Sequence, residues 1–278
     1  MHCHRCIRFF VAAACFLVLA SGARGDAMKD STGAQKRAAR EMNKRFADLQ
    51  LRKIYVSDFV DARGERTLPT RFLAATFCEL LSDHGKNERI LSRGEAHNFL
   101  DKNGWSEKDL GNPDALSKFV SALSVDAILS GVLSLKQNLY TIDFTARDVA
   151  GKELFHDRFQ DRIAPSILWV LVAERSGLDA DIPLAGLDGV TQPKCARCPP
   201  PDYTQSARKD KLQGTILFSV IITADGKVDH IIVVEGLDPS VDHAAAETIK
   251  KWKLEPCHNA AGQIVPALTQ IEVVFRMY

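Results

Sequence analysis

Three cysteines and one histidine in the second half of the chain are the residues whose types and spacing could do chemistry. Cys195 and Cys198 form a Cys-x-x-Cys pair in the stretch PKCARCPPPDY, and Cys257 precedes His258. All four are zinc-ligand types, and the first pair has the usual spacing of half a zinc site. Cys257 and His258 do not fit as the other half of such a zinc site, because two adjacent residues would be strained in presenting both side chains to one tetrahedral ion. The pattern therefore argues against a metal site.

A redox dithiol and a structural disulfide are the other two interpretations of the Cys-x-x-Cys pair. A redox pair has its first cysteine at a helix N-terminus, where the helix dipole lowers the pKa of the thiol. Here three prolines follow the pair directly. We therefore expect a structural disulfide, either Cys195–Cys198 or one of these two cysteines joined to Cys257.

Other patterns that carry catalysis are absent from the sequence. It contains no glycine-rich phosphate loop, nucleophile elbow or His-Glu-x-x-His motif. Acidic residues such as Asp58, Asp61 and Asp143 are scattered along strand ends, where solvated or capping roles are expected. The histidines at 84, 97, 156, 230 and 243 form no ligand spacing. We expect no catalytic residues, no cofactor and no metal.

The N-terminus bears on whether a disulfide can form. Basic and polar residues at 2–8 precede an apolar run over residues 9–20, and small residues in SGARGDA follow. This order is typical of a secretory signal peptide, with cleavage after Ala23 or Gly25. The run is shorter than the about 20 residues that span a bilayer as a helix. We expect residues 1–25 to be a signal peptide and the protein to be periplasmic, with an uncleaved inner-membrane anchor as the alternative. Membrane contact is expected only in that second case.

Composition excludes some classes of function. The chain has 278 residues, 46% of them hydrophobic, and a formal net charge of +1. This is enough for one or two ordinary domains with a real core. Nothing in the charge balance points to nucleic acid.

The elements that must carry these residues fall into two groups. After a leader helix within residues 26–51, periodicity predicts a strand at 52–61, a helix at 67–82, a strand at 89–93 and helices at 94–104 and 113–123. Three strands at 125–135, 139–149 and 152–162 then read as an antiparallel meander, and a helix follows at 165–177. Cys78 lies on the apolar face of its helix and is expected to be a core residue. The sequence predicts a mixed α/β domain over residues 52–177.

The segments KIYVSDFVD, RILSRGE and LSVDAILSGVLSLKQNLYTIDFTARDVAGKELF carry a resemblance in this first domain. In order and separation they resemble the α/β domain of the TolB, CsgG and LpoB-like envelope proteins. The resemblance implies a non-catalytic domain that docks on other proteins.

A linker and a smaller module complete the chain. Residues 178–200 are rich in Asp, Gly and Pro and lack periodicity, which predicts the linker. Then come a short helix at 204–213, strands at 214–223 and 228–236 joined by an Asp-Gly turn, a helix after Asp238-Pro239, a loop at 255–263 and a terminal strand at 264–278. Val241, Ala245, Ile249 and Trp252 are expected on one face of the second helix. Residues 201–278 thus form an α+β module of helix, strand, strand, helix and strand.

This module resembles the C-terminal domain of TonB-family energy transducers over about residues 196–278. The matching motif residues are Pro201, Tyr203, Gly214, Asp225, Gly226, Asp242, Trp252 and Pro256. The resemblance implies a periplasmic module that binds a segment of an outer-membrane transporter by adding a strand to its sheet edge. It also implies that the module transmits force from an inner-membrane motor.

The terminal strand is our candidate for the partner-binding edge. Its residues Ile271, Glu272, Val273 and Phe275 alternate as a strand does, although the same strand could serve only to complete the core. The chain lacks the long proline-rich spacer and the convincing spanning helix of a full transducer. We expect a non-enzymatic periplasmic protein that binds a protein partner in the envelope, an outer-membrane transporter being one candidate. The alternative is a structural cell-envelope or peptidoglycan-associated scaffold that is not coupled to transport.

Overall fold

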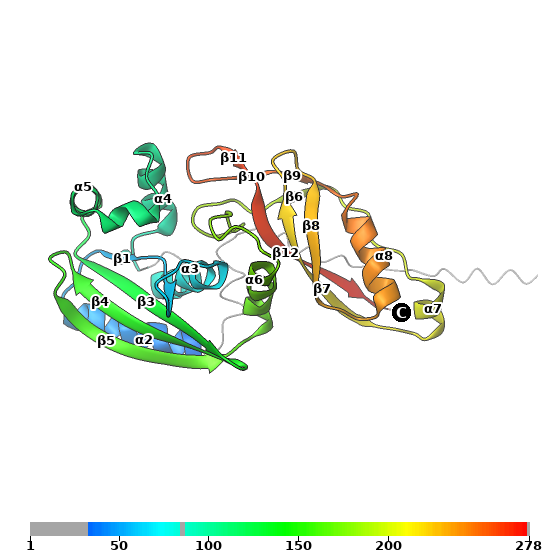
Figure 1. Ribbon diagram of the computed structural model, residues 1–278, viewed down its shortest axis with the longest axis horizontal. Helices are drawn as coiled ribbons and strands as arrows, with labels where there is room; N and C mark the ends of the chain where they lie inside the picture. Colours follow the sequence, from blue (N-terminus) through cyan, green and yellow to red (C-terminus); the bar gives the residue numbers. More distant parts are fainter. Residues whose placement is uncertain (1–32, 84–86, 277–278) are drawn as a thin grey trace, which may run out of the picture.

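A computed structural model describes residues 33–83 and 87–276 of the chain. The predicted signal peptide and the last residues of the predicted terminal strand lie outside the described residues. The fold has two parts that lie side by side, each built on its own sheet (Figure 1). The predicted fold class, a mixed α/β domain followed by a small α+β module, is confirmed.

The first sheet contains the predicted meander. It is formed by β1 (Ile54–Val56), β2 (Val60–Asp61), β3 (Ala127–Lys136), β4 (Leu139–Asp148) and β5 (Glu153–Arg162). The strand order is β1-β3-β4-β5, and β2 also pairs with β3. Strands β3, β4 and β5 are antiparallel neighbours, while β1 and β2 run parallel to β3. The meander follows directly from three alternating strands joined by short turns.

Helices cover this sheet and close its core. They are α2 (Gly33–Asp48), α3 (Leu68–Ser82), α4 (Arg93–Lys102), the 3-10 helix η1 (Glu107–Gly111), α5 (Pro113–Leu123) and α6 (Pro165–Arg175). Phe77 of α3 stacks edge-on against Phe144 and Phe159 of the sheet. Met42 and Phe46 are buried in the same core, so the leader helix is an integral part of this domain.

Two predictions for this domain have clear outcomes. Cys78 is buried in the core, where burial raises the pKa of its thiol to about 12 and makes it inert. The predicted strand at 89–93 is wrong, because only a single bridge joins Ile54 to Ile90. Ser92 instead caps α4 by accepting a hydrogen bond from the Glu95 N–H, which starts the helix where the strand was expected to end.

The second sheet has three antiparallel strands in the order β12-β7-β8. Its elements are α7 (Gln205–Lys209), β7 (Gly214–Ile222), β8 (Val228–Glu235), α8 (Pro239–Ile249) and β12 (Ala267–Phe275). The predicted order of helix, strand, strand, helix and strand is confirmed. Asp238 caps α8 by accepting from the Ser240 N–H, as the Asp-Pro pair predicts.

The structure corrects the detail around Trp252. Helix α8 ends at Ile249, so Trp252 lies beyond the helix and not on its face. The indole is nonetheless buried in the same core as Val241, Ala245 and Ile249. Its Nε1–H donates to the carbonyl of Pro199 at 2.8 Å, which fixes the start of the module to its core.

Two short strands, β6 and β10, occupy segments that the sequence suggested were linker and loop. β6 (Lys194–Arg197) pairs with β9 (Lys253–Glu255), and β10 (Cys257–His258) pairs with β11 (Ile264–Val265). The predicted terminal strand is therefore split into β11 and β12, with Pro266 between them. Proline has no N–H to donate to a ladder, which favours a break at that position.

The predicted linker is an ordered bridge between the two parts. Leu184 and Leu187 are buried in the core of the first domain, together with Leu268 of β12. Helix α6 packs on α3 on one side and on β7 and β8 on the other, so it forms a shared layer (Figure 1). The exact domain limits at 177 and 201 remain a prediction.

The Asp-Gly turn of the second module gives a sharp test of the fold. Gly226 has φ 76°, and a Cβ atom there would lie 2.0 Å from the carbonyl oxygen of Leu254. Gly262 has a similar φ of 80°, but a Cβ there would meet nothing within 4 Å. We expect Gly262→Ala to lower the free energy of unfolding by about 1–2 kcal/mol through backbone strain alone. Gly226→Ala should cost about 3 kcal/mol or more, because the clash adds to that strain. Urea unfolding of both variants measures the difference, and equal costs would contradict the close approach.

Candidate functional site: the β12 edge and a buried charge network

Strand β12 lies at one end of the second sheet and contains all four residues predicted to bind a partner. It pairs with β7 without a register shift from Ala267 opposite Ile222 to Phe275 opposite Gly214. The side chains of Ile271, Val273 and Phe275 are buried in the core of the module. The alternate side chains, including Glu272 and Val274, are half-buried on the opposite face. What this strand can offer a partner is therefore mainly its main chain.

The hydrogen bonds of Leu268 reveal which main-chain groups face outward. Its N–H donates to the carbonyl of Pro183 at 2.8 Å, and its carbonyl accepts from the Ala185 N–H at 2.9 Å. Both groups thus point away from β7. Because outward and inward positions alternate along an antiparallel strand, the main chains of Gln270 and Val274 face outward as well. Those of Ile271 and Val273 face β7.

β12 is the sheet edge best suited to pairing with another chain. β8, at the opposite edge, has two register shifts against β7, and His230 within it has φ 48°. β5 carries a charged or polar side chain at most of its positions. β1 has only three residues. Bulges, charges and short length are the usual devices that protect an edge; β12 is nine residues long, pairs with β7 without a register shift and carries a single charged residue, Glu272.

Most of the family-motif residues build the module around this strand. The Tyr203 ring packs edge-on against the Phe275 ring, with the two ring centroids 4.9 Å apart. This contact joins the start of the module to the end of β12. Asp242 accepts hydrogen bonds from the N–H groups of Leu237 and Asp238 and so fixes the start of α8. Gly214 begins β7 against Leu237, and Pro201 is buried. Pro256 follows β9 directly.

The cysteines adopt one of the two pairings left open by the sequence. Cys195 and Cys198 form a disulfide with their Cα atoms 6.0 Å apart. Cys257 is a free, buried cysteine whose thiol pKa is raised by burial to about 11. Over residues 33–83 and 87–276, no three His, Cys, Asp or Glu side chains are grouped so that they could hold a metal ion. The disulfide joins Cys195 of β6, which pairs with β9, to Cys198 directly after that strand, and it closes a small loop before the three prolines.

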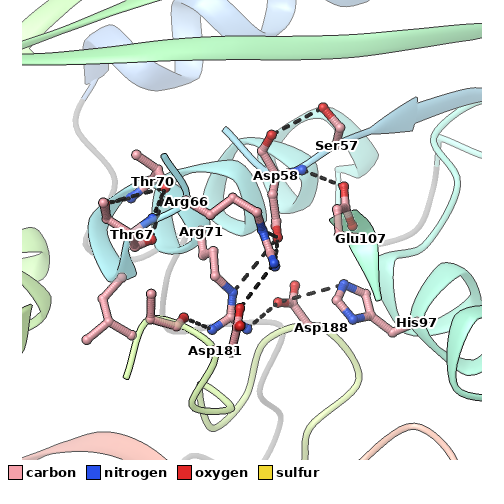
Figure 2. Close-up of polar contacts among 12 residues, drawn as sticks. Ser57, Asp58, Arg66, Thr67, Thr70, Arg71, His97, Glu107, Asp181 and Asp188 are labelled. Carbon is pink, nitrogen blue, oxygen red and sulfur yellow. Dashed lines mark hydrogen bonds and ion pairs between the residues drawn. The ribbon is translucent and has the colours of Figure 1, made fainter. Parts of the chain in front are cut away.

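A buried network of charges, which the sequence did not predict, lies where the linker meets the first domain, and Figure 2 shows the part of it around Asp58, Arg66, Arg71 and Asp188. Its centre is Arg93, at the first turn of α4, with a side chain only 3% exposed. The guanidinium forms ion pairs with Asp58, after β1, and with Asp188, in the linker. It also donates to the carbonyl of Val56 at 2.9 Å. Arg93 therefore joins a strand end of the first domain to the linker.

Two more arginines hold the same linker. Arg66 pairs with Asp58 and, at 3.1 Å, with Asp181 of the linker. Arg71 of α3 donates through Nη1 to the carbonyls of Ala180 and Ile182. Figure 2 shows both arginines reaching from the α3 side toward these acidic and carbonyl oxygens.

The pKa shifts in the network follow from its geometry. Burial alone would raise the pKa of Asp188, but Arg93, with smaller contributions from His97 and Arg71, outweighs burial and holds that pKa well below its ordinary value. Burial and the Asp188 charge would also raise the pKa of Asp58, but Arg93, Arg66 and Arg71 together lower it. Burial and the nearby Asp58 charge raise the pKa of Glu107. Both oxygens of Glu107 accept hydrogen bonds from the protein itself, one from the Tyr55 hydroxyl and one from the Asp58 N–H.

This arrangement favours a structural role. Asp58 and Asp188 stay ionised and accept hydrogen bonds from arginine side chains, and both oxygens of Glu107 accept hydrogen bonds from within the protein. None of the three carboxyl groups is therefore arranged to exchange a proton with a substrate. The expectation of a solvated or capping role for Asp58 is wrong, because its side chain is 1% exposed. His97, considered an isolated histidine, lies 3.9 Å from Asp188. The available sequence signal was the placement of Arg71 and Arg93 among apolar residues of α3 and the start of α4.

We predict that Arg93→Met is strongly destabilising. It leaves the buried carboxylate of Asp188 without its closest cation, which typically costs about 3–5 kcal/mol. Arg89→Met is the matched control: Arg89 is exposed on the same segment, so its loss should change stability little. Chemical denaturation monitored by tryptophan fluorescence compares the two. If Arg93→Met lowers the free energy of unfolding no more than Arg89→Met does, the network does not contribute to stability.

The lowered pKa of Asp188 predicts acid sensitivity. Because its folded-state pKa lies below the unfolded value, the stabilisation is complete above the ordinary pKa of about 4 and is lost as pH falls toward the folded pKa. Asp188→Asn cannot titrate at this position. The stability advantage of the wild type over Asp188→Asn should therefore narrow by up to about 1.4 kcal/mol per pH unit below pH 4. Unfolding curves between pH 3 and pH 7 test this, and a constant difference would contradict it.

Comparisons with known proteins agree with the C-terminal module described above. The family described as Gram-negative bacterial TonB protein C-terminal matches residues 199–277. No curated protein is similar enough in sequence to be matched with the chain.

Solved structures with similar folds include both kinds of protein that the sequence resembles. The LpoB C-terminal domain from Escherichia coli is 14% identical, with a TM-score of 0.36, and the match covers 46% of this chain and 97% of that one. The TonB C-terminal domain of Pseudomonas aeruginosa is 27% identical, with a TM-score of 0.27, over 32% of this chain and 87% of that one. The corresponding Helicobacter pylori TonB domain is 28% identical, with a TM-score of 0.21, over 27% of this chain and 78% of that one. The family match covers the C-terminal module alone, and the larger α/β domain precedes it in the chain.

Proposed function

We propose that the chain is a non-enzymatic, periplasmic TonB-like protein that binds a protein partner of the bacterial envelope. The observation that carries the proposal is the regular β12 edge within the region that matches the TonB family. The partner supplies an extended segment, which pairs with the outward-facing main chain of β12. A segment of an outer-membrane transporter is the candidate that the family resemblance suggests.

Strand addition gives this binding a physical basis. Outward N–H and C=O groups at positions such as Gln270 and Val274 can exchange their hydrogen bonds with water for bonds to an added strand. The buried alternation of Ile271, Val273 and Phe275 keeps β12 flat and in register while it does so. Affinity comes from the main chain, and specificity comes from the half-buried side chains beside it.

Export to the periplasm fits the covalent chemistry of the module. The Cys195–Cys198 disulfide is a bond that persists in oxidising compartments. Residues 1–25 act as the signal peptide in this proposal, and an uncleaved anchor at the inner membrane remains the alternative. Among residues 33–83 and 87–276, no helix is both long and apolar enough to cross a membrane. A mature N-terminus beginning near Asp26, found by mass spectrometry, would distinguish cleavage from anchoring.

A proline at Val274 tests strand addition without breaking the module. The Val274 N–H faces outward, so Val274→Pro removes a docking donor but no hydrogen bond to β7. We expect the variant to stay folded and to bind its envelope partner at least about tenfold more weakly. Full-length protein is used to capture partners from an outer-membrane extract, and the captured protein is then titrated against each variant.

Two control variants at neighbouring or identical positions accompany Val274→Pro. Val274→Thr keeps the N–H and should bind as the wild type does. Val273→Pro removes an inward donor to β7 and should unfold the sheet. Unchanged partner binding by a folded Val274→Pro would rule out strand addition on β12 and favour the scaffold alternative, in which the module binds in the envelope without transport.

A further inference from the structure

Part of the proposed docking edge is already occupied by the chain itself. Residues 183–185 run parallel to β12 and form two main-chain hydrogen bonds with Leu268, one from its N–H to Pro183 and one to its carbonyl from Ala185. The Leu184 side chain between them is 0% exposed. These residues show that the outer edge of β12 accepts a strand, and that at Leu268 it has accepted one from its own linker.

The geometry after Ala185 explains why this pairing stops. Gly186 has φ 83°, and its N–H donates to the carbonyl of Val190 at 3.0 Å. The Leu187 N–H donates back to Leu184 at 3.1 Å. This tight turn takes the chain away from β12, so the segment does not continue along Gln270 and Val274. Among the described residues, no backbone hydrogen bond joins the outward main-chain groups of those two positions to another segment.

The segment is held from both ends by the first domain. Before it, the Arg71 guanidinium binds the carbonyls of Ala180 and Ile182. After it, Asp188 pairs with the buried Arg93. Lifting the segment from β12 would expose Leu184 and Leu187 and would separate a buried ion pair. The segment is also part of the same chain, so its effective concentration at the edge is of millimolar order or higher.

We propose that residues 183–185 are a fixed stop on the docking edge, which limits an added strand to positions 270–275 of β12. The partner is then an extended polypeptide segment paired over roughly 20 Å, and its register is limited at one end by Ala185 and Gly186. This inference rests on strand addition as the proposed function. The stop itself is a property of the chain alone and can be tested without a partner.

Amide hydrogen exchange on the full chain tests the stop. We expect the amides of Leu268 and Ala185 to exchange slowly in the wild type, and the outward amide of Val274 to exchange quickly. Asp188→Asn removes the ion pair to Arg93 and should speed exchange at Leu268 and Ala185 together by about tenfold or more, while Val273 is unchanged. Asp179→Asn is the matched control, because Asp179 is an exposed residue of the same linker and asparagine keeps the side-chain oxygen that accepts from the Asp181 N–H. Equal exchange at Leu268 and Val274 in the wild type, or no joint response in Asp188→Asn, would overturn the proposal.

A peptide of residues 181–190 provides the second measurement. Labelled with fluorescein, it should show no saturable binding to the wild type, whose edge is filled at this point. It should bind the double variant Leu184→Gly, Asp188→Ala, whose own segment has lost the buried Leu184 side chain and the ion pair to Arg93. A peptide with the same two changes should not bind. Equal binding to both proteins, or binding to neither, would overturn the stop. Neither measurement involves an envelope partner. If the Val274→Pro experiment rules out strand addition, these two measurements still decide whether the stop exists.

Discussion

The ion pair between Arg93 and Asp188 is the contact on which the joining of the two parts depends. Both side chains are almost fully removed from water, and a buried charge is tolerated only when its partner is in place. Arg93 comes from α4, which a serine cap starts at the right residue, and Asp188 comes from the segment that follows α6. The pair forms only when the linker folds against the first domain. The charge network therefore makes the position of the linker specific, while the buried leucines supply much of the apolar contact.

The two parts are therefore joined by a packed, ordered junction and not by a flexible linker. Helix α6 packs on both sheets, and Leu184 links the core of the first domain to the edge of the second. Interfaces between domains are often polar and mobile. Here the junction combines apolar packing, main-chain pairing and buried ion pairs, so the C-terminal module is held in a fixed orientation toward the first domain.

The sequence predicted the parts of the fold that obey local rules. The alternation in 125–162, the Asp-Gly turn at 225–226 and the Asp-Pro start of α8 each specify their structure from a few neighbouring residues. The linker and the charge network were not predictable in this way. Leu184 reads as one apolar residue among turn formers, and its burial depends on contacts with β12 far along the chain. Asp58 reads as a strand-end carboxylate, because nothing near it in the sequence identifies Arg93 as its partner. The edge position of β12 was inferred from a resemblance, and its outward register required the observed bonds of Leu268.

The same contacts determine how a pull on β12 would enter the first domain. A pull on a segment paired as proposed would load β12 along its length, where the hydrogen bonds of the ladder to β7 would resist together. From there the load has two routes, one through β7 and β8 into α6 and one through Leu268 into the linker. The second route ends at Arg93 and Arg71, which are anchored in the helices of the first domain. Because the buried pair resists separation more than an exposed one would, the linker can carry load without unpairing from the edge. If β12 were pulled in this way, the load would therefore pass directly into the packed first domain.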